Sequence, residues 1–281
     1  MMHLLMILCA LSLACYLRLN WSDPKESWTE RWQRSLLLFL FPPLLLIMTA
    51  ASVLFMGPEG QMVDLWDGWL SYELALGFFG WAGVNCLKVA IQGHRSVRQV
   101  RTYPQIDIGS KSARLLNTSA LFTCQIGFWQ PELIVSQGLL QTLDHEHLEA
   151  VLTHEQAHYY YRDTFWFFWL GWLRSYTAWL PNTEALWEEL LALRELRADY
   201  WAATQVDSLL LAESLLLVVS KKPRVSEVVC AEFSAAAPPN RLTERIEALL
   251  GEPEKAHQPN LWFWMWLLWA FLPLLAVPFH S

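Results

Sequence analysis

Four long apolar stretches constrain this 281-residue chain more than any other feature. They cover residues 2–18, 36–56, 71–92 and 261–279. Each approaches the about 20 helical residues that cross the hydrocarbon core of a bilayer. The composition agrees, because only 17% of the residues are charged, whereas about a quarter are charged in soluble domains. We therefore expect a mainly α polytopic membrane protein with about four transmembrane helices, in contact with the lipid bilayer.

Two of these stretches need comment. The first could be a signal peptide, but no basic residue precedes it and residues 11–15 form only a poor lipoprotein cleavage box. A retained span is therefore the favoured interpretation. The second is expected to be interrupted at Pro42 and Pro43, a break that membrane helices tolerate when neighbours satisfy the freed carbonyl groups.

The loop charges predict the orientation. Arg18 ends the first stretch and three more basic residues follow it before the second. Residues 57–70 contain three acidic residues and no Lys or Arg, and three Arg follow the third stretch. Cytoplasmic loops carry the excess of Lys and Arg. We therefore expect three transmembrane helices in residues 1–92, a cytoplasmic domain in 93–260 and a C-terminal transmembrane helix in 261–281. The membrane is expected to be the cell membrane.

The segment between the third and fourth stretches has the pattern of a small α+β domain. Residues 121–126 and 132–135 favour strands on either side of a turn-like break at 127–131. Asp144 is a good N-cap for a helix over residues 145–162. Further helices are expected at 181–203, 208–219 and 242–250, with a loop at 221–240.

The sequence His154-Glu155-Gln156-Ala157-His158 lies within the helix expected at residues 145–162. Spacing i, i+4 places both imidazole groups on one helix face, where they can bind one Zn²⁺ ion. Glu155 stands beside them, where its carboxylate can accept a proton from water. The alternative is a pair of ordinary histidines on a polar helix face.

A catalytic zinc site needs a third protein ligand and an open position. Glu195 and Asp199 are again four residues apart on an expected helix. We predict that Glu195 completes a His₂Glu site with His154 and His158, and that Asp199 orients one of the imidazole rings. The alternative is a solvated acidic helix face, since two further Glu precede this segment.

The two motifs together resemble the membrane-embedded zinc metallopeptidases of the gluzincin type. One branch of these enzymes contains HtpX and the CAAX-prenyl proteases, and another contains the BlaR/MecR-like antirepressor peptidases. Residues 127–140, 148–158 and 242–250 resemble the second branch, as does the position of Asp163. This resemblance implies an endopeptidase that cleaves a protein or peptide substrate at the cytoplasmic face, with a repressor protein as one candidate substrate.

The chain also departs from both branches. After the last stretch there is no penicillin-binding sensor domain, so antibiotic sensing is not implied. Residues 238–240 lack the His-Pro pair that precedes a functional Arg in the HtpX branch. Arg245 is the candidate for that residue, as a donor to the oxyanion. The alternative is a surface Arg that pairs with Glu244 or Glu247. Asp163 is expected to brace the site or to cap the next helix.

A fifth apolar run, residues 164–180, cannot be a simple span if Glu195 and His158 bind the same ion. A single crossing would place Glu195 on the wrong side of the membrane. We therefore expect an interfacial or re-entrant helix, with its Trp residues at the level of the lipid headgroups and Arg174 reaching water.

Other function classes are less compatible with the residues. The net charge is −7 and the basic residues form no long cluster, so no direct contact with nucleic acid is expected. The five Cys contain no CxxC pair, which argues against a disulfide framework and a thiolate metal site. Two alternatives to the antirepressor interpretation remain, a quality-control or processing protease like HtpX and a zinc-dependent signalling protein without turnover.

Overall fold

The computed structural model describes residues 2–21, 27–59, 65–109, 111–220, 241–251 and 261–279. The loop predicted at 221–240 lies outside the described residues. The chain divides into two compact units. We call them the helical unit (Met1–Leu87, Trp172–Leu190 and Ala256–Ser281) and the mixed unit (Lys88–Gly171 and Leu191–Lys255).

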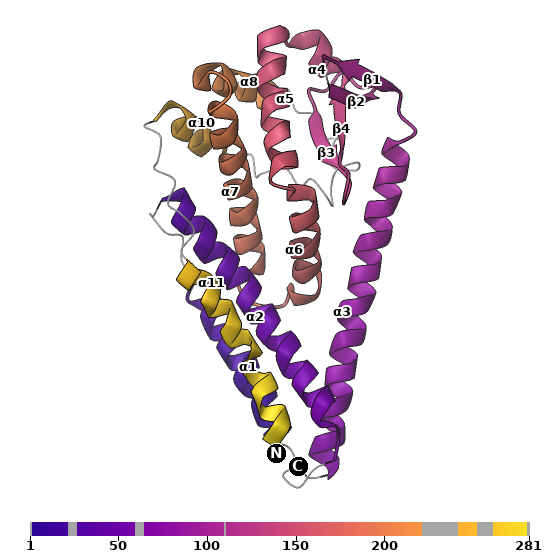
Figure 1. Cartoon of the computed structure of the whole chain (residues 1–281), viewed down its shortest axis with the longest axis vertical. Coiled ribbons are helices and arrows are strands. Elements are labelled where there is room, and N and C mark those ends of the chain that lie inside the picture. Colours follow the sequence, from indigo (N-terminus) through magenta and orange to yellow (C-terminus); the bar gives the residue numbers. More distant parts are fainter. Residues whose placement is uncertain are drawn as a thin grey trace. The chain divides into compact units, whose positions relative to one another are not determined.

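Three helices of the described chain are long and apolar enough to cross a membrane (Figure 1). They are α1 (Met2–Leu19), α2 (Trp28–Met56) and α3 (Leu65–Val100). The fourth apolar stretch forms a shorter helix, α11 (Leu261–Leu268), which continues as the 3₁₀ helix η3 (Trp269–Phe279). Pro273 and Pro278 within η3 remove two backbone N–H donors, and this disfavours a regular α-helix there.

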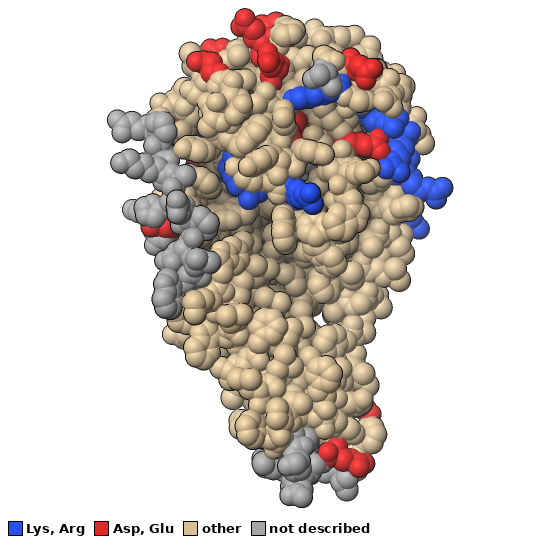
Figure 2. Space-filling model, in the orientation of Figure 1, with Lys and Arg blue, Asp and Glu red and all other residues tan. Residues whose placement is uncertain are grey.

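The surface of the spans agrees with their apolar sequence. On the face shown in Figure 2, almost no charged side chain lies over α1, α2 or the first half of α3, until acidic side chains appear at the far end. Within the helical unit, α1 and η3 both pack against α2. Hydrocarbon-facing surfaces are expected to be apolar in this way, because an unpaired charge is costly in lipid.

The predicted interruption at Pro42 and Pro43 is not observed, because α2 runs through both residues without a break. Pro43 has no N–H to donate to the carbonyl oxygen of Phe39, four residues earlier. That oxygen accepts a hydrogen bond from Arg18 Nη2 at 3.3 Å instead. Arg18 is fully buried and lies over the Phe39 ring. A side chain of α1 therefore satisfies the group that proline leaves unpaired.

The fifth apolar run folds as the first half of a helical hairpin. Helix α6 (Asp163–Thr177) is followed by a turn and by α7 (Thr183–Ala203), and the adjoining ends of the two helices belong to the helical unit. Trp172 Nε1 donates to the Ala82 carbonyl of α3 at 2.9 Å. The hairpin therefore packs against a candidate span. Its depth in the membrane stays a prediction.

Polar contacts hold the start of α7 in the helical unit. Asn182 Nδ2 donates to the Arg18 carbonyl at 2.8 Å, and Arg31 Nη2 pairs with Glu189 at 2.6 Å. The Glu189 side chain is fully buried. Arg174, which was expected to reach water, is 40% exposed and pairs with Glu184.

The mixed unit contains a four-stranded sheet in the order β1-β2-β4-β3. The strands are β1 (Gln105–Ile108), β2 (Lys111–Leu116), β3 (Thr123–Ile126) and β4 (Glu132–Ser136). Strands β2 and β4 are parallel, and the other two pairs are antiparallel. The turn between β3 and β4 begins at Gly127, whose φ of +139° favours glycine. The strand predictions are confirmed near their expected ends.

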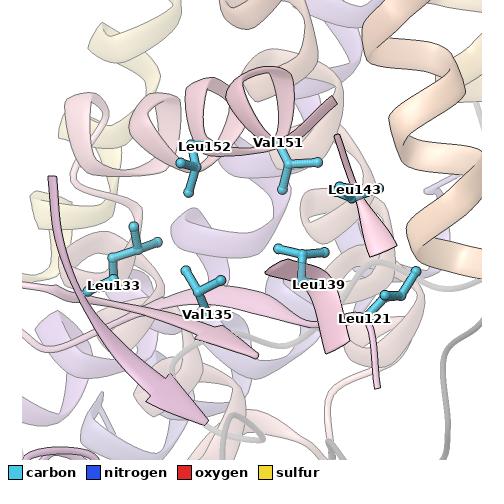
Figure 3. Close-up of a cluster of buried hydrophobic side chains, with 8 residues drawn as sticks. Leu121, Leu133, Val135, Leu139, Leu143, Val151 and Leu152 are labelled. Atoms are coloured by element: carbon cyan, nitrogen blue, oxygen red, sulfur yellow. The ribbon is translucent and has the colours of Figure 1, made fainter. Parts of the chain in front are cut away.

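Helices cover one face of the sheet. Helix α4 (Gln137–Thr142), which the sequence did not predict, leads into α5 (His145–Tyr160). Asp144 caps α5 as predicted, since its side chain accepts from the His147 N–H at 2.9 Å. Figure 3 shows Val151 and Leu152 of α5 pointing at Val135 of β4 and Leu139 of α4. Burying each such side chain contributes about 1.5–3 kcal/mol, so this core fixes α5 on the sheet.

Two further helices complete the mixed unit. They are α8 (Ser208–Ser220) and α10 (Leu242–Leu250), both close to their predicted bounds. Helix α8 packs against α5 and α10 packs against α8. Ala150 of α5, Ala202 of α7, Leu211 of α8 and Leu249 of α10 share one buried cluster. This cluster joins α5 and α7 next to the motif residues, through the small side chains of Ala150 and Ala202.

Candidate metal centre

The two motif histidines face each other at the end of α5. His154 and His158 are one turn apart, as the spacing predicted, and their Nε2 atoms are 3.1 Å apart. Both side chains are largely buried, with 8% and 11% of their surfaces exposed. The alternative of two histidines on a solvated polar face does not describe this arrangement.

Glu195 meets them from α7. Its Oε2 atom lies 3.4 Å from His154 Nε2, and its Oε1 atom lies 3.7 Å from His158 Nε2. One ligand atom from each of the three residues lies within 4.8 Å of the others. The solvated acidic face considered above is not observed, because the Glu195 side chain is only 10% exposed.

Carboxylates occupy the outer nitrogen atoms of both rings. His154 Nδ1 lies 2.8 Å from Asp199 Oδ1, and His158 Nδ1 lies 2.7 Å from Asp163 Oδ2. With a proton at each Nδ1, each Nε2 would direct its lone pair at the other ring and at Glu195. Two neutral imidazole groups and one carboxylate are a donor set that Zn²⁺ prefers, so the residues present fit this ion.

Three arginines hold the three carboxylates that surround the site. Arg245 makes two bonds to Asp199, at 2.6 and 2.7 Å. Arg194 Nη2 lies 2.8 Å from Glu195 Oε1, and Arg197 Nη2 donates to Asp163 Oδ1. The sequence analysis missed Arg194 and Arg197. Their positions beside Glu195 on a buried helix were the available signal, since buried charges are almost always paired.

Arg245 is buried and does not lie at the surface. Only 9% of its side chain is exposed, and its Nη1 atom lies 3.4 Å from Glu195 Oε2. The alternative of a surface Arg that pairs with Glu244 or Glu247 therefore does not describe Arg245. Asp199 raises the pKa of Arg245, although burial opposes this effect, so this guanidinium stays charged.

The two glutamates of the site differ in the pKa of their carboxyl groups. Burial raises the pKa of the Glu155 carboxyl, against the opposing influence of His158 and His154. Burial also acts on Glu195, but His158 and Arg194 lower its pKa to well below the usual value. Such a difference between neighbouring carboxyl groups is typical of sites that transfer protons. The two carboxyl groups therefore differ in how strongly they hold a proton.

The remaining histidines of the segment are not part of this cluster. His147 Nδ1 lies 2.7 Å from Asp144, at the opposite end of α5 from the metal-site residues. His145 is exposed in the first turn of the same helix. The three-residue cluster His154, His158 and Glu195 is the one of its kind found in the described part of the chain.

Residues 122–236 match the model of peptidase family M48. The matched region contains His154, Glu155, His158, Asp163, Glu195 and Asp199, and it ends before Arg245. No curated protein matches the chain. Together with the three apolar helices, the match supports a membrane-associated metallopeptidase. The match does not distinguish the antirepressor branch from the other branch, so the assignment to that branch stays a prediction.

Proposed function

We propose that this chain is an integral-membrane zinc endopeptidase that cleaves protein substrates at the cytoplasmic face of the cell membrane. One observation carries the proposal: the Nε2 atoms of His154 and His158 face each other and Glu195, while carboxylates occupy both Nδ1 atoms. A non-catalytic zinc site would need no base, yet Glu155 stands buried beside these ligands.

In the proposed mechanism, His154, His158 and Glu195 hold the ion. When bound, Zn²⁺ acts as a Lewis acid toward the scissile carbonyl and makes water more acidic. Glu155 accepts the proton of the attacking water molecule and delivers it to the leaving amine. Burial raises the pKa of the Glu155 carboxyl, and a raised pKa favours its holding the proton between the two transfers. Arg245 is the candidate donor to the developing oxyanion.

The edge of the sheet provides a place for the substrate backbone. The two strands predicted from the sequence are β3 and β4. Strand β4 lies between β2 and β3, so both of its edges are occupied. Strand β3 is at the edge of the sheet and packs against α5. Gln125 of β3 also donates to the carbonyl oxygen of Glu155 at 3.5 Å. We propose that substrate adds to β3 as an extra strand.

A cavity of about 500 Å³ lies between the sheet and α5. Strands β2 and β4 supply most of its strand residues, and it reaches β3 at Gln125, near Gln156 and Tyr159 of α5. These three residues come from β3 and from the helix that carries the metal-site histidines. Side chains of an added strand alternate between the two faces of a sheet. We propose that the cavity receives one of these alternate side chains of the substrate.

Two classes of protein substrate are candidates. The resemblance to the antirepressor branch suggests a repressor protein, and the HtpX-like alternative suggests misfolded membrane proteins. A Glu155→Gln variant should retain its substrate, so proteins that co-purify with it can be identified by mass spectrometry. Enrichment of a repressor over a control with an exposed change on the same helix, Glu146→Gln, supports regulatory cleavage. Enrichment of membrane proteins supports quality control, and no enrichment argues against turnover.

A further inference from the structure

Asp163 has partners on two different helices. Its Oδ2 atom lies 2.7 Å from His158 Nδ1 of α5, and its Oδ1 atom accepts a hydrogen bond from Arg197 of α7. The Asp163 side chain is 3% exposed. A buried carboxylate has lost its hydration and depends on protein donors for both oxygen atoms. Its orientation is therefore set by His158 and Arg197 together.

The turn before Asp163 explains how it reaches His158. Helix α5 ends at Tyr160, α6 begins at Asp163, and Arg162 between them has a φ of 53°, in the left-handed region. This reversal returns the Asp163 side chain to the ring of His158, five residues earlier. Arg197 also contacts this turn, because its guanidinium lies 4.3 Å from the centre of the Tyr161 ring, within the range of a cation–π interaction.

The same order of groups occurs at the other histidine. His154 contacts Asp199, and Asp199 accepts two hydrogen bonds from one edge of the Arg245 guanidinium group, from Nε and Nη2. Each of the two candidate histidine ligands thus has a carboxylate at its Nδ1 atom, and an arginine binds that carboxylate. The repetition, built from different helices, indicates that the arginine is part of how each ring is held.

We propose that Arg197 is a positioning residue for the metal ligand His158, and that it acts through Asp163. The inference rests on the proposed function for the identity of the ligand. Without the guanidinium, Asp163 Oδ1 loses its donor and the carboxyl group can rotate away from His158 Nδ1. The ring of His158 then loses the contact that holds it toward His154 and Glu195.

Zinc affinity of the full chain in lipid nanodiscs tests this directly, by competition with a chromophoric chelator. Partners of ligating histidines typically change metal affinity 10–100-fold. We expect Arg197→Gln to weaken zinc binding about tenfold. Arg101→Gln is the matched control, because it removes an ion pair with Glu132 away from the site. It should bind zinc like the parent.

A double variant tests whether the effect passes through Asp163. Asp163→Asn alone should weaken zinc binding at least as much as Arg197→Gln, and the combination should be no weaker than Asp163→Asn alone. Effects that multiply would overturn the proposal, because they would mean that Arg197 acts independently. Parent affinity in Arg197→Gln would overturn it as well.

Two further measurements cover misfolding and the proposed function. If Arg197→Gln does not fold, the visible spectrum of the Co²⁺-substituted Arg197→Lys variant decides, since a point charge cannot reproduce the planar fork of Arg. Altered bands support the proposal, and bands identical to those of the parent refute it. Absence of zinc binding in the parent would instead remove the proposed function.

Discussion

Glu195 and Asp199 hold opposite nitrogen atoms of one imidazole ring. The first lies 3.4 Å from His154 Nε2, and the second lies 2.8 Å from His154 Nδ1. Because the two carboxylates are one turn apart on α7, this helix contributes both a candidate ligand and the group that orients a second ligand. The zinc centre that we propose therefore depends on how α7 is placed against α5.

Glu155→Gln should abolish peptide cleavage and leave zinc bound. The amide cannot accept the proton of the attacking water, and loss of a general base typically costs 10²–10⁴-fold in rate. Zinc content by atomic emission and turnover of an unfolded reporter protein check the two halves of this prediction. Glu146→Gln, an exposed change on the same helix, should behave like the parent. Unchanged turnover in Glu155→Gln would remove the mechanism.

Glu195→Ala should lose metal, because the site is left with two protein ligands. Its expected defect is therefore in zinc content itself, unlike that of Glu155→Gln. Glu188→Ala on the same helix is the control, since Glu188 is exposed. Full zinc occupancy in Glu195→Ala, measured after dialysis against a weak chelator, would contradict the ligand assignment.

The left-handed backbone at Arg162 predicts that two substitutions there differ in their effect on the melting temperature. Arg162→Gly should keep or raise the melting temperature, because a side chain in this conformation costs about 1–2 kcal/mol. Arg162→Val should lower it, since β-branched residues tolerate positive φ least. The same changes at exposed Gln141 in α4 should reverse the order, because glycine destabilises a helix by about 1 kcal/mol. Equal effects at both positions would argue against the turn.

The predicted topology places Glu59 outside the cell and Glu146 in the cytoplasm. Both residues are exposed, so a single cysteine at either position can be labelled in a variant that lacks the five native cysteines. A membrane-impermeant maleimide should label Glu59→Cys in intact cells and Glu146→Cys only after permeabilisation. The opposite pattern would show that the basic residues do not face the cytoplasm.

Much of the local structure could be predicted from spacing. The pairs His154 and His158, and Glu195 and Asp199, share a helix face because an α-helix repeats every 3.6 residues. The Asp144 cap and the start of α7 after Pro181 follow from the same short-range rules. These features depend on neighbours within about one turn, and that information is present in a short segment of sequence.

Contacts between distant segments could not be predicted in this way. The continuity of α2 through Pro43 depends on Arg18, 21 residues away from the carbonyl that it satisfies. The position of β4 inside the sheet depends on its parallel pairing with β2. Local propensity contains no information about either partner.

The sequence by itself determined the candidate site residues and the candidate spans, because the i, i+4 pairs and the apolar stretches are local patterns. Only the tertiary structure decided what surrounds them. Arg197 of α7 reaches Asp163 of α6, and Arg245 of α10 reaches Asp199 of α7, because these helices meet in the mixed unit. A buried charged side chain pairs with an opposite charge that lies within reach. Which helix supplies that charge depends on how the helices pack.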